Sequence, residues 1–328
     1  MAKHAVYIDG ASGTTGLQIQ DRLESREEIE LIVLDGDRRK DLSRRLEALS
    51  RAEIGILCLP DAAAREIAAA APPESRIIDA STAHRVQPGW VYGFPELRTA
   101  ANQARRREAL GGARRVAVPG CHATGFLALA LPLIQTGLIA PSRRFHCHSL
   151  TGYSGGGNTM IAAYQDPRRP PDYSSPRQYG LNLEHKHLPE MQSIGGLERP
   201  PLFCPIVDDF YQGMLVSLSL GLEEFANPGP PPSIEALRAV FADYYRDEPL
   251  IHTAEGIPRD GTMASNTLAG RDDLEIWITG GGDQRLLMAR FDNLGKGASG
   301  AAVQCLNLML GLPEYQGLRF RKGPDAAA

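Results

Sequence analysis

The segment HAVYIDGASGTTGLQIQDRLES, residues 4–25, decides the fold class of this chain. It starts with an apolar run of strand length and ends in a run with the 3.6-residue spacing of a helix. Gly10, Gly13 and Gly16 lie between the two runs, three positions apart. Glycines at such a junction allow a tight turn and bring a pyrophosphate close to the N–H groups that start a helix. The segment therefore predicts the phosphate-binding turn of a nucleotide-binding domain; the alternative is an ordinary glycine-rich turn.

The same alternation of strand and helix continues to about residue 121. Apolar runs predict four further strands, at residues 29–36, 52–60, 76–81 and 114–120. Helical spacing lies between them, at residues 39–49 and 62–71. Short apolar strands that alternate with helices are typical of a parallel sheet covered by helices. We therefore expect an α/β fold with a Rossmann-like, parallel-sheet nucleotide domain.

The pattern changes after about residue 140. Strand-like runs at residues 202–220 and 273–281 lie further apart and favour an antiparallel arrangement. Proline-rich loops interrupt the chain at residues 166–177 and 226–233, and residues 297–312 predict an amphipathic helix. We expect a second, α+β catalytic domain with a mainly antiparallel sheet, over residues 122–297.

The composition excludes several kinds of partner. The chain has 328 residues, enough for two domains, and a formal net charge of −4, which gives no basis for binding nucleic acid or a membrane surface. We expect no secretory signal before the first strand. The longest apolar stretch, residues 125–134, is too short to span a bilayer and contains Pro132. We expect a cytoplasmic protein.

The five cysteines indicate neither a disulfide framework nor a zinc ribbon, because their number is odd and no C-x-x-C pair occurs. In the segment HCHSL, strand alternation would place His146 and His148 on one face and Cys147 on the other. Two histidines on one face could hold a metal, but an ordinary strand with two different faces explains the pattern better. We expect no metal.

The end of the second strand, LDGDRRKD, bears on the choice of dinucleotide. An acidic residue there binds the ribose hydroxyls of NAD, whereas arginines accommodate the 2′-phosphate of NADP. Asp35 and Asp37 favour NAD, while Arg38, Arg39 and Lys40 favour NADP. Because arginine binds a phosphate dianion through two hydrogen bonds, NADP is the better match. The alternative is a solvated, charged helix start.

Cys121 is the candidate nucleophile. It follows a strand and a Pro-Gly turn and precedes an apolar helical run, so it lies at a predicted helix N-terminus. That position lowers the pKa of a thiol and so favours the reactive thiolate. The alternative is a buried structural thiol, an interpretation that suits Cys58 and Cys305 because both lie within apolar runs.

The segment LNLEHKHLPEMQSI offers an acid/base partner for a thiol. His187 and Glu190 are three positions apart, so on a helix the carboxylate could orient the imidazole. His185 is the second histidine of the segment. A metal site of the form H-x-H-x-x-E and a polar helix start are the alternatives.

Together these segments resemble the short type of N-acetyl-gamma-glutamyl-phosphate reductase, a family of the semialdehyde dehydrogenase superfamily in arginine biosynthesis. The resemblance covers nearly the whole chain. It rests on GASGTTGLQI, CLPDAAAREI, DASTAHR, VYGFPEL, PGCHATG, LTGYSGGGN, EHKHLPEM, FYQGML and DNLGKGASGAAVQ.

The resemblance implies a function. It is the NADPH-dependent reduction of N-acetyl-L-glutamyl 5-phosphate to N-acetyl-L-glutamate 5-semialdehyde and phosphate, through a thioester on Cys121. His187 is the better candidate for the acid/base, with His185 left open, and Arg85 matches a position that faces phosphate or substrate. The implied cofactor-binding residues are Gly10, Ser12, Gly13, Thr14, Thr15, Gly16, Arg38, Arg39, Ser154, Gly155 and Asn293.

The resemblance also implies a discontinuous first domain, residues 1–121 and 298–328, and a homodimer or homotetramer. The chain departs from the family pattern at three positions: Val118 and His122 replace the Asn and Tyr of N-P-G-C-Y, and Asn158 replaces a frequent lysine. The alternatives are an aspartate-semialdehyde dehydrogenase, a cysteine-dependent hydrolase or acyltransferase, and a non-catalytic NADP-binding protein.

Overall fold

The computed structural model describes residues 3–99, 104–226, 229–258 and 260–321. The chain divides into two compact units. The first comprises residues 1–120 and 298–318, and the second comprises residues 121–297 and 319–328. Each unit contains one β-sheet.

The first unit contains a six-stranded sheet in the order β2-β1-β3-β4-β6-β5, with every neighbouring pair parallel. Its strands are β1 (His4–Asp9), β2 (Ile29–Val33), β3 (Ile54–Leu57), β4 (Ile77–Asp79), β5 (Val91–Tyr92) and β6 (Arg115–Ala117). Its helices are α1 (Thr14–Glu24), α2 (Leu42–Arg51), α3 (Asp61–Ala70), α4 (Arg106–Gly111) and α9 (Gly300–Leu310). A 3-10 turn, Gly36–Lys40, precedes α2, so the predicted helix at residues 39–49 begins later than expected.

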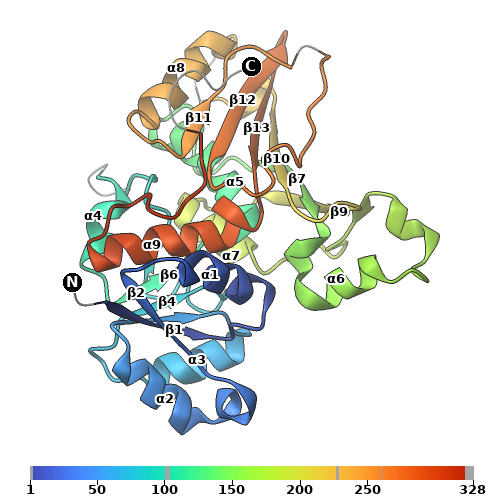
Figure 1. The fold of residues 1–328 in the computed structure, drawn as a ribbon. Helices are drawn as coiled ribbons and strands as arrows, with labels where there is room; N and C mark the ends of the chain where they lie inside the picture. The colour runs from blue at the N-terminus through green and yellow to red at the C-terminus, as the bar shows by residue number, and fades with distance from the viewer. Residues whose placement is uncertain (1–2, 100–103, 227–228, 259, 322–328) are drawn as a thin grey trace. The chain divides into compact units, whose positions relative to one another are not determined.

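Both faces of this sheet are buried, as continuous apolar strands require. Val6 and Ile8 pack in a core with residues of α1 and α9, while Tyr7, between them, packs in a second core with residues of α2 and α3. Figure 1 shows α1 and α9 on one side of the sheet and α2 and α3 on the other. The period-2 alternation of a strand therefore supplies two cores from each strand.

The helix expected within residues 297–312 is present as α9, but it begins at Gly300 and it is not amphipathic. A five-residue π-helix, Gly295–Ser299, precedes α9, and α9 is buried at nearly every position. Its polar side chains are bonded inside the unit: Gln304 Nε2 donates to Glu96 Oε1 at 2.8 Å, and Asn307 Oδ1 accepts from Arg26 Nη1 at 2.7 Å. The polar positions thus serve buried hydrogen bonds rather than a solvated face.

The second unit contains a seven-stranded sheet in the order β11-β12-β13-β10-β7-β9-β8, with parallel pairing only for β11–β12 and β7–β9 among the described strands. Its strands are β7 (His146–Gly152), β8 (Arg177–Gln178), β9 (Leu202–Asp208), β10 (Met214–Leu220), β11 (Ile251–Thr253), β12 (Leu274–Gly281) and β13 (Gln284–Phe291). Its helices are α5 (Cys121–Gln135), α6 (Gly157–Gln165), α7 (Leu188–Gly195) and α8 (Ile234–Tyr244). Its short 3-10 turns are Tyr153–Gly156, Pro171–Ser174 and Leu222–Glu224. The two sheets confirm the predicted fold class.

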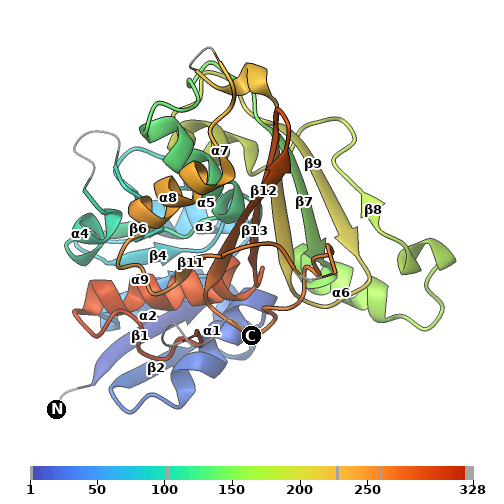
Figure 2. The ribbon, with the colours of Figure 1, turned by 90° about the horizontal axis from the view of Figure 1, so that it is seen from above.

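One face of this second sheet carries α5, α7 and α8 (Figure 2). The strands alternate accordingly: in β7, His146 and His148 are exposed while Cys147 is buried, which confirms the predicted faces. Helix α5 packs closely on the sheet, because a Cβ at Gly125 would lie 2.5 Å from the Val216 side chain. The glycine is therefore what lets this buried helix approach β10.

Helix α5 contains Pro132, which has no N–H to donate to the carbonyl of Ala128, four residues earlier. The Tyr245 hydroxyl donates to that carbonyl at 2.8 Å instead. The buried acceptor is therefore satisfied, and the helix continues through the proline. Among the described residues, no helix is both long and apolar enough to cross a membrane.

Candidate active site

The glycine turn lies where β1 ends and α1 begins. Gly10 has φ +84°, a region that favours glycine, and a Cβ there would lie 2.3 Å from the Cys58 carbonyl oxygen. A Cβ at Gly16 would lie 2.3 Å from the Gly10 carbonyl oxygen. Gly13 is the N-cap of α1, and its own Cβ would meet no atom closer than 3.4 Å. Gly10 and Gly16 are thus required by the chain itself, and Gly13 leaves the helix N-terminus accessible.

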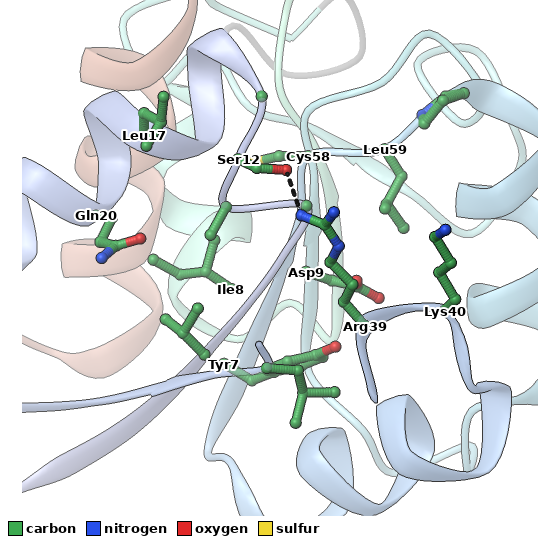
Figure 3. A pocket seen from close by; sticks show the side chains of 16 residues that line it. Tyr7, Ile8, Asp9, Ser12, Leu17, Gln20, Arg39, Lys40, Cys58 and Leu59 are labelled. Atoms are coloured by element: carbon green, nitrogen blue, oxygen red, sulfur yellow. Dashed lines mark hydrogen bonds between the residues drawn. The ribbon is translucent and has the colours of Figure 1, made fainter. Parts of the chain in front are cut away.

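A pocket of about 560 Å³ opens at this turn (Figure 3). Arg39 extends across it, and its Nη1 donates to Ser12 Oγ at 3.5 Å. Of the predicted cofactor residues in this unit, Gly10, Ser12, Gly13 and Arg39 line the pocket, whereas Thr14, Thr15, Gly16 and Arg38 do not. The remaining lining residues are Tyr7, Ile8, Asp9, Ala11, Leu17, Gln20, Val33, Leu34, Lys40, Cys58, Leu59 and Pro60.

The donor groups of this pocket fit part of a dinucleotide. The N-terminus of α1 lies at the glycine turn that lines this pocket, which suits a pyrophosphate. Arg39 and Lys40 add positive charge, and Leu17, Val33 and Leu34 add apolar surface. Asp35 and Asp37, the residues that favour NAD, do not line the pocket.

Asp9, which lines this pocket, belongs to a buried ion pair. Arg45 Nε donates to Asp9 Oδ2 at 2.9 Å, and both side chains are less than a tenth exposed. Burial raises the pKa of Asp9, and the Arg45 guanidinium opposes that rise. The pair therefore joins α2 to the last residue of β1, directly before the glycine turn in the chain.

In the second unit, Cys121 is the first residue of α5, as the sequence predicts, and its side chain is partly exposed. The Cys121 Sγ atom, a ring nitrogen of His122 and a ring nitrogen of His187 lie within 4.8 Å of one another. His187 is the N-cap of α7, and it is 5% exposed. A thiol and an imidazole at this separation can exchange a proton with a small adjustment.

The two predicted histidines differ in their surroundings. His185 Nδ1 accepts from the backbone N–H of His187 at 3.2 Å, which commits that nitrogen to the loop before α7. The rings of His185 and His187 are edge to face at 4.8 Å. Glu190, in the first turn of α7, is buried. The structure thus brings His187, rather than His185, into the group of atoms that includes the thiol.

His122 lies beside the candidate nucleophile and has partners on both ring nitrogens. Its Nδ1 is 2.7 Å from Ser149 Oγ, and its Nε2 is 2.7 Å from the Tyr179 hydroxyl. Its ring also packs edge to face against Phe203 at 5.2 Å. The imidazole is therefore fixed in position by β7, by β9 and by the residue that follows β8.

Burial, together with the smaller effect of the charges of His185 and Lys186, lowers the pKa of His122 to about 3. His122 is therefore neutral at physiological pH and does not act as a general base there. Burial raises the pKa of Tyr179 above its ordinary value, and the charge of Cys121 adds to that rise. Tyr179 is thus a neutral hydroxyl within electrostatic reach of Cys121.

Cys121, His122 and His187 are also the kind of residues that bind zinc. Because both nitrogens of His122 already have hydrogen-bond partners, a metal bound by all three side chains would have to displace Ser149 or Tyr179. Neither metal pattern in the sequence, HCHSL at residues 146–150 or H-x-H-x-x-E at residues 185–190, contains all three of these residues.

Arg85 is buried in the first unit. Its Nε donates to the Val118 carbonyl at 2.9 Å, and its Nη2 donates to the Ala80 carbonyl at 3.4 Å. Val118 lies three residues before Cys121 in the chain. The observed contacts therefore hold the backbone of the segment that leads to the thiol.

The remaining predicted cofactor residues cluster in the second unit. Asn293 Nδ2 donates to Ser154 Oγ at 3.0 Å, and Asn293 Oδ1 accepts from the Gly213 N–H at 2.8 Å. Gly155 lies beside them, since a Cβ there would be 3.5 Å from Asn293 Nδ2. The structure thus brings Ser154 and Gly155 together with Asn293, which lies nearly 140 residues further along the chain.

Sequence reasoning missed Ser149 and Tyr179. Neither has a spacing signal, because they lie 27 and 57 residues from His122 and belong to other elements. It also missed Gly297, where a Cβ would lie 2.9 Å from the Cβ of Cys121. A signal for Gly297 was present, since it lies in the glycine-rich segment DNLGKGASG.

Comparison with known proteins gives a consistent result. A model described as the semialdehyde dehydrogenase NAD binding domain matches residues 5–104, and one described as the semialdehyde dehydrogenase dimerisation domain matches residues 121–293. The chain is 44% identical to N-acetyl-gamma-glutamyl-phosphate reductase 2 of Nostoc sp., over 97% of this chain and 100% of that protein. It is 42% identical to N-acetyl-gamma-glutamyl-phosphate reductase of Brucella ovis, over 94% and 99%.

Solved structures show the same fold. Aspartate semialdehyde dehydrogenase II of Vibrio cholerae has a TM-score of 0.66 at 16% identity, covering 95% of this chain and 99% of that one. Aspartate semialdehyde dehydrogenase of Francisella tularensis has a TM-score of 0.68 at 12% identity, covering 94% and 100%. At these identities the likeness concerns the fold alone.

Proposed function

Because this chain belongs to the N-acetyl-gamma-glutamyl-phosphate reductase family of semialdehyde dehydrogenases, we propose that it reduces N-acetyl-L-glutamyl 5-phosphate to N-acetyl-L-glutamate 5-semialdehyde and phosphate, with NADPH as hydride donor. The observation that carries the proposal is the proximity of the Cys121 thiol, at the start of α5, to the His187 imidazole. Relatives that bear this name match nearly the full length of the chain.

In the first half of the reaction, the Cys121 thiol provides the nucleophile and the His187 imidazole transfers protons. His187 takes the Cys121 thiol proton on a ring nitrogen, and the thiolate attacks the acyl-phosphate carbonyl carbon. The C–O bond to phosphate breaks, phosphate leaves with the bonding electrons, and His187 returns a proton to it. A thioester on Cys121 remains. The two side chains have polar atoms within 4.8 Å of each other, which supports these roles for Cys121 and His187.

The second half releases the aldehyde. A bound reduced nicotinamide supplies the hydride that reduces the thioester. The C–S bond then breaks, the sulfur leaves as a thiolate, and His187 restores the thiol proton with one taken from water. Arg85 is the proposed cationic residue that binds substrate or phosphate. Its hydrogen bonds to the carbonyls of Val118 and Ala80 also hold the backbone of the segment before Cys121.

The residues of the first-unit pocket support NADPH over NADH. Arg39 and Lys40 line the pocket, and an arginine binds a phosphate dianion through charge-assisted hydrogen bonds. Asp35 and Asp37 do not line it. We therefore assign Arg39 and Lys40 to the 2′-phosphate, and Gly10, Ser12 and Gly13 to the pyrophosphate.

The decisive experiment runs the reaction in reverse, as reduction of NADP⁺ by the purified protein. N-acetyl-glutamate semialdehyde and aspartate semialdehyde are compared, each with and without phosphate. The proposal predicts activity with the first substrate only, and only with phosphate. Activity with aspartate semialdehyde alone would make the protein an aspartate-semialdehyde dehydrogenase, and no activity with either would favour a binding role.

The variant Cys121→Ser tests the covalent step. It should abolish turnover and leave NADPH binding intact, because Cys121 is not part of the pocket at the glycine turn. The control is Cys204→Ser, which removes a partly exposed thiol from β9 and should keep activity. Activity in Cys121→Ser would overturn the thioester mechanism.

We also propose a homodimer, formed through the uncovered face of the seven-stranded sheet. Among the described residues, that face carries half-exposed apolar side chains beside polar ones such as His146, His148 and Ser217. The apolar ones are Leu150, Leu202, Cys204, Ile206, Leu215, Trp277, Leu286 and Met288. The matching family model is described as a dimerisation domain, which supports the proposal. An apolar patch of this kind is typical of an interface between subunits.

Light scattering after size-exclusion chromatography tests this proposal. The wild type should elute as a dimer, or as a tetramer that contains it, and Leu215→Asp should shift it toward the monomer. The control is Leu181→Asp, which alters a residue that is 74% exposed outside the sheet. A wild-type monomer would contradict the proposal. We place the protein in the cytoplasm, where thiols such as Cys121 stay reduced.

A further inference from the structure

His122, the residue next to the candidate nucleophile, is a buried histidine with a hydrogen-bond partner on each ring nitrogen. His122 is 3% exposed and has one hydroxyl on each ring nitrogen, that of Ser149 on Nδ1 and that of Tyr179 on Nε2. Each of these distances is 2.7 Å. A neutral imidazole has one N–H donor and one bare nitrogen acceptor, so the two bonds must run in opposite senses.

Ser149 decides which nitrogen carries the proton. Its side chain is 0% exposed, and within the described part of the chain its hydroxyl has no hydrogen-bond partner other than His122. If His122 donated to Ser149, the serine hydrogen would be buried with nothing to bond, at the cost of an unsatisfied donor. Ser149 therefore donates to Nδ1, and the proton of His122 is on Nε2.

The position of this proton determines how the Tyr179 hydroxyl is bonded to His122. Because Nε2–H donates to the Tyr179 oxygen, the hydrogen of the Tyr179 hydroxyl is not used by His122. Tyr179 lies near the thiol, because its hydroxyl is 2.7 Å from His122 Nε2 and a ring nitrogen of His122 lies within 4.8 Å of Cys121 Sγ. It also lines a cavity of about 470 Å³, together with residues of α6 and β9. The hydroxyl hydrogen is thus available to a group in the neighbourhood of the thiol.

We propose that Ser149 and His122 act as positioning residues that direct the Tyr179 hydroxyl hydrogen toward negative charge on the Cys121 side. That charge is the thiolate before attack and the oxygen of the tetrahedral intermediate after it. A preorganised neutral donor aimed at developing charge is an effective form of catalysis. Stabilisation of the tetrahedral intermediate rests on the proposed function, whereas stabilisation of the thiolate depends only on the Cys121 thiol.

The other titratable side chains around this group come from the loop before α7 and its first turn. They are His185, Lys186, His187 and Glu190. None of them is changed by replacing Tyr179 with phenylalanine, so a change in the thiol's titration in that variant reports on the Tyr179 hydroxyl.

The first test measures the rate of Cys121 alkylation by iodoacetamide as a function of pH. Tyr179→Phe should shift the midpoint of the profile upward by about one pH unit or more, since a hydrogen bond to a charged group contributes roughly ten- to a hundredfold. Ser149→Ala should shift it in the same direction by less. Tyr173→Phe, which removes a hydroxyl from the same cavity, is the matched control and should follow the wild type.

The second test needs no variant. Nitrogen NMR of the histidine side chains distinguishes the two neutral tautomers, and His122 should carry its proton on Nε2. A proton on Nδ1, or a Tyr179→Phe profile that coincides with the wild type, would overturn the proposal. Both measurements are made without substrate. If the protein does not act on the proposed substrate, these two measurements remain valid. A shifted profile in a protein that acts on another substrate would support the donor role of the Tyr179 hydroxyl and not the proposed function.

Discussion

Gly297 lies against Cys121. A Cβ added at position 297 would be 2.9 Å from the Cβ of Cys121 and 3.3 Å from its Cα. Gly297→Ala should therefore displace the nucleophile by a fraction of an ångström, because the segment that carries residue 297 is itself buried. We expect kcat to fall about ten- to a hundredfold, since a displacement near 1 Å at a reacting centre costs about a hundredfold.

The control for this prediction is Gly281→Ala, because no atom lies within 4 Å of a Cβ added there. That variant should keep kcat within about twofold, as is usual for surface changes. NADPH affinity should be unchanged in both variants. A Gly297→Ala enzyme with normal kcat and a normal rate of Cys121 alkylation would show that the backbone can accommodate the methyl group without moving the thiol.

Arg39 offers a test of dinucleotide choice. It lines the pocket at the glycine turn, while its neighbour Arg38 does not. Arg39→Gln should raise the KM for NADPH about ten- to a hundredfold and leave the KM for NADH nearly constant, because a charge-assisted bond to the 2′-phosphate is lost. Arg38→Gln is the matched control. Equal losses for the two dinucleotides would move Arg39 from the 2′-phosphate to a group that both share.

The first domain was largely predictable, because its signals are local. Three glycines between a strand and a helix, followed by short apolar strands, predict a parallel sheet, and the six parallel strands confirm it. Cys121 was equally visible, since a Pro-Gly turn before an apolar run predicts a helix start. Such features depend on neighbours in sequence, and the physics that produces them acts over a few residues.

The parts that failed depend on distant neighbours. The polar residues of α9 suggested a solvated face, yet Gln304 and Asn307 bond to Glu96 and Arg26, which lie 208 and 281 residues away. The hydrogen bonds of His122 could likewise not be predicted from the sequence, because its partners come from β7 and from the residue after β8. Buried hydrogen bonds of this kind are fixed by tertiary packing, which a single sequence does not display.

The proline in α5 leads to a prediction about stability. Tyr245→Phe should remove the donor that satisfies the Ala128 carbonyl in place of the missing Pro132 N–H. A buried carbonyl left without a donor costs about 1–3 kcal/mol. For a unit of this size, the thermal midpoint should fall by about 2–4 °C per kcal/mol. Differential scanning calorimetry measures the change directly.

The adjacent residue provides the control for that stability measurement. Tyr244 donates to Gln135 Oε1 at 2.8 Å, on a side chain that is only partly buried. Water can replace that donor, so Tyr244→Phe should lower the midpoint less than Tyr245→Phe. Equal shifts would mean that the Ala128 carbonyl finds another donor, and that Pro132 needs no compensation from Tyr245.

His122 leads to a prediction about pH. Its pKa in the folded protein is about 3, against 6.5 for an ordinary histidine, because burial disfavours the charged ring. Below pH 6.5 the unfolded chain binds a proton at this position and the folded chain does not. The folded state therefore loses about 1.4 kcal/mol for each pH unit below 6.5, down to the folded pKa. Above pH 6.5 the contribution is constant.

His122→Gln should remove this dependence, since glutamine does not titrate. The free energy of unfolding of the wild type, measured by urea at a series of pH values, should fall relative to that of the variant by about 2 kcal/mol between pH 6.5 and pH 5. Ser217→Ala, a neutral change in the same sheet, should give a curve parallel to the wild type. Parallel curves for the wild type and His122→Gln would mean that His122 becomes protonated within the folded protein. In that case Nδ1 would also carry a proton at these pH values and could not accept from Ser149. The neutral His122 ring of the proposed Ser149–His122–Tyr179 arrangement would then exist only under more alkaline conditions.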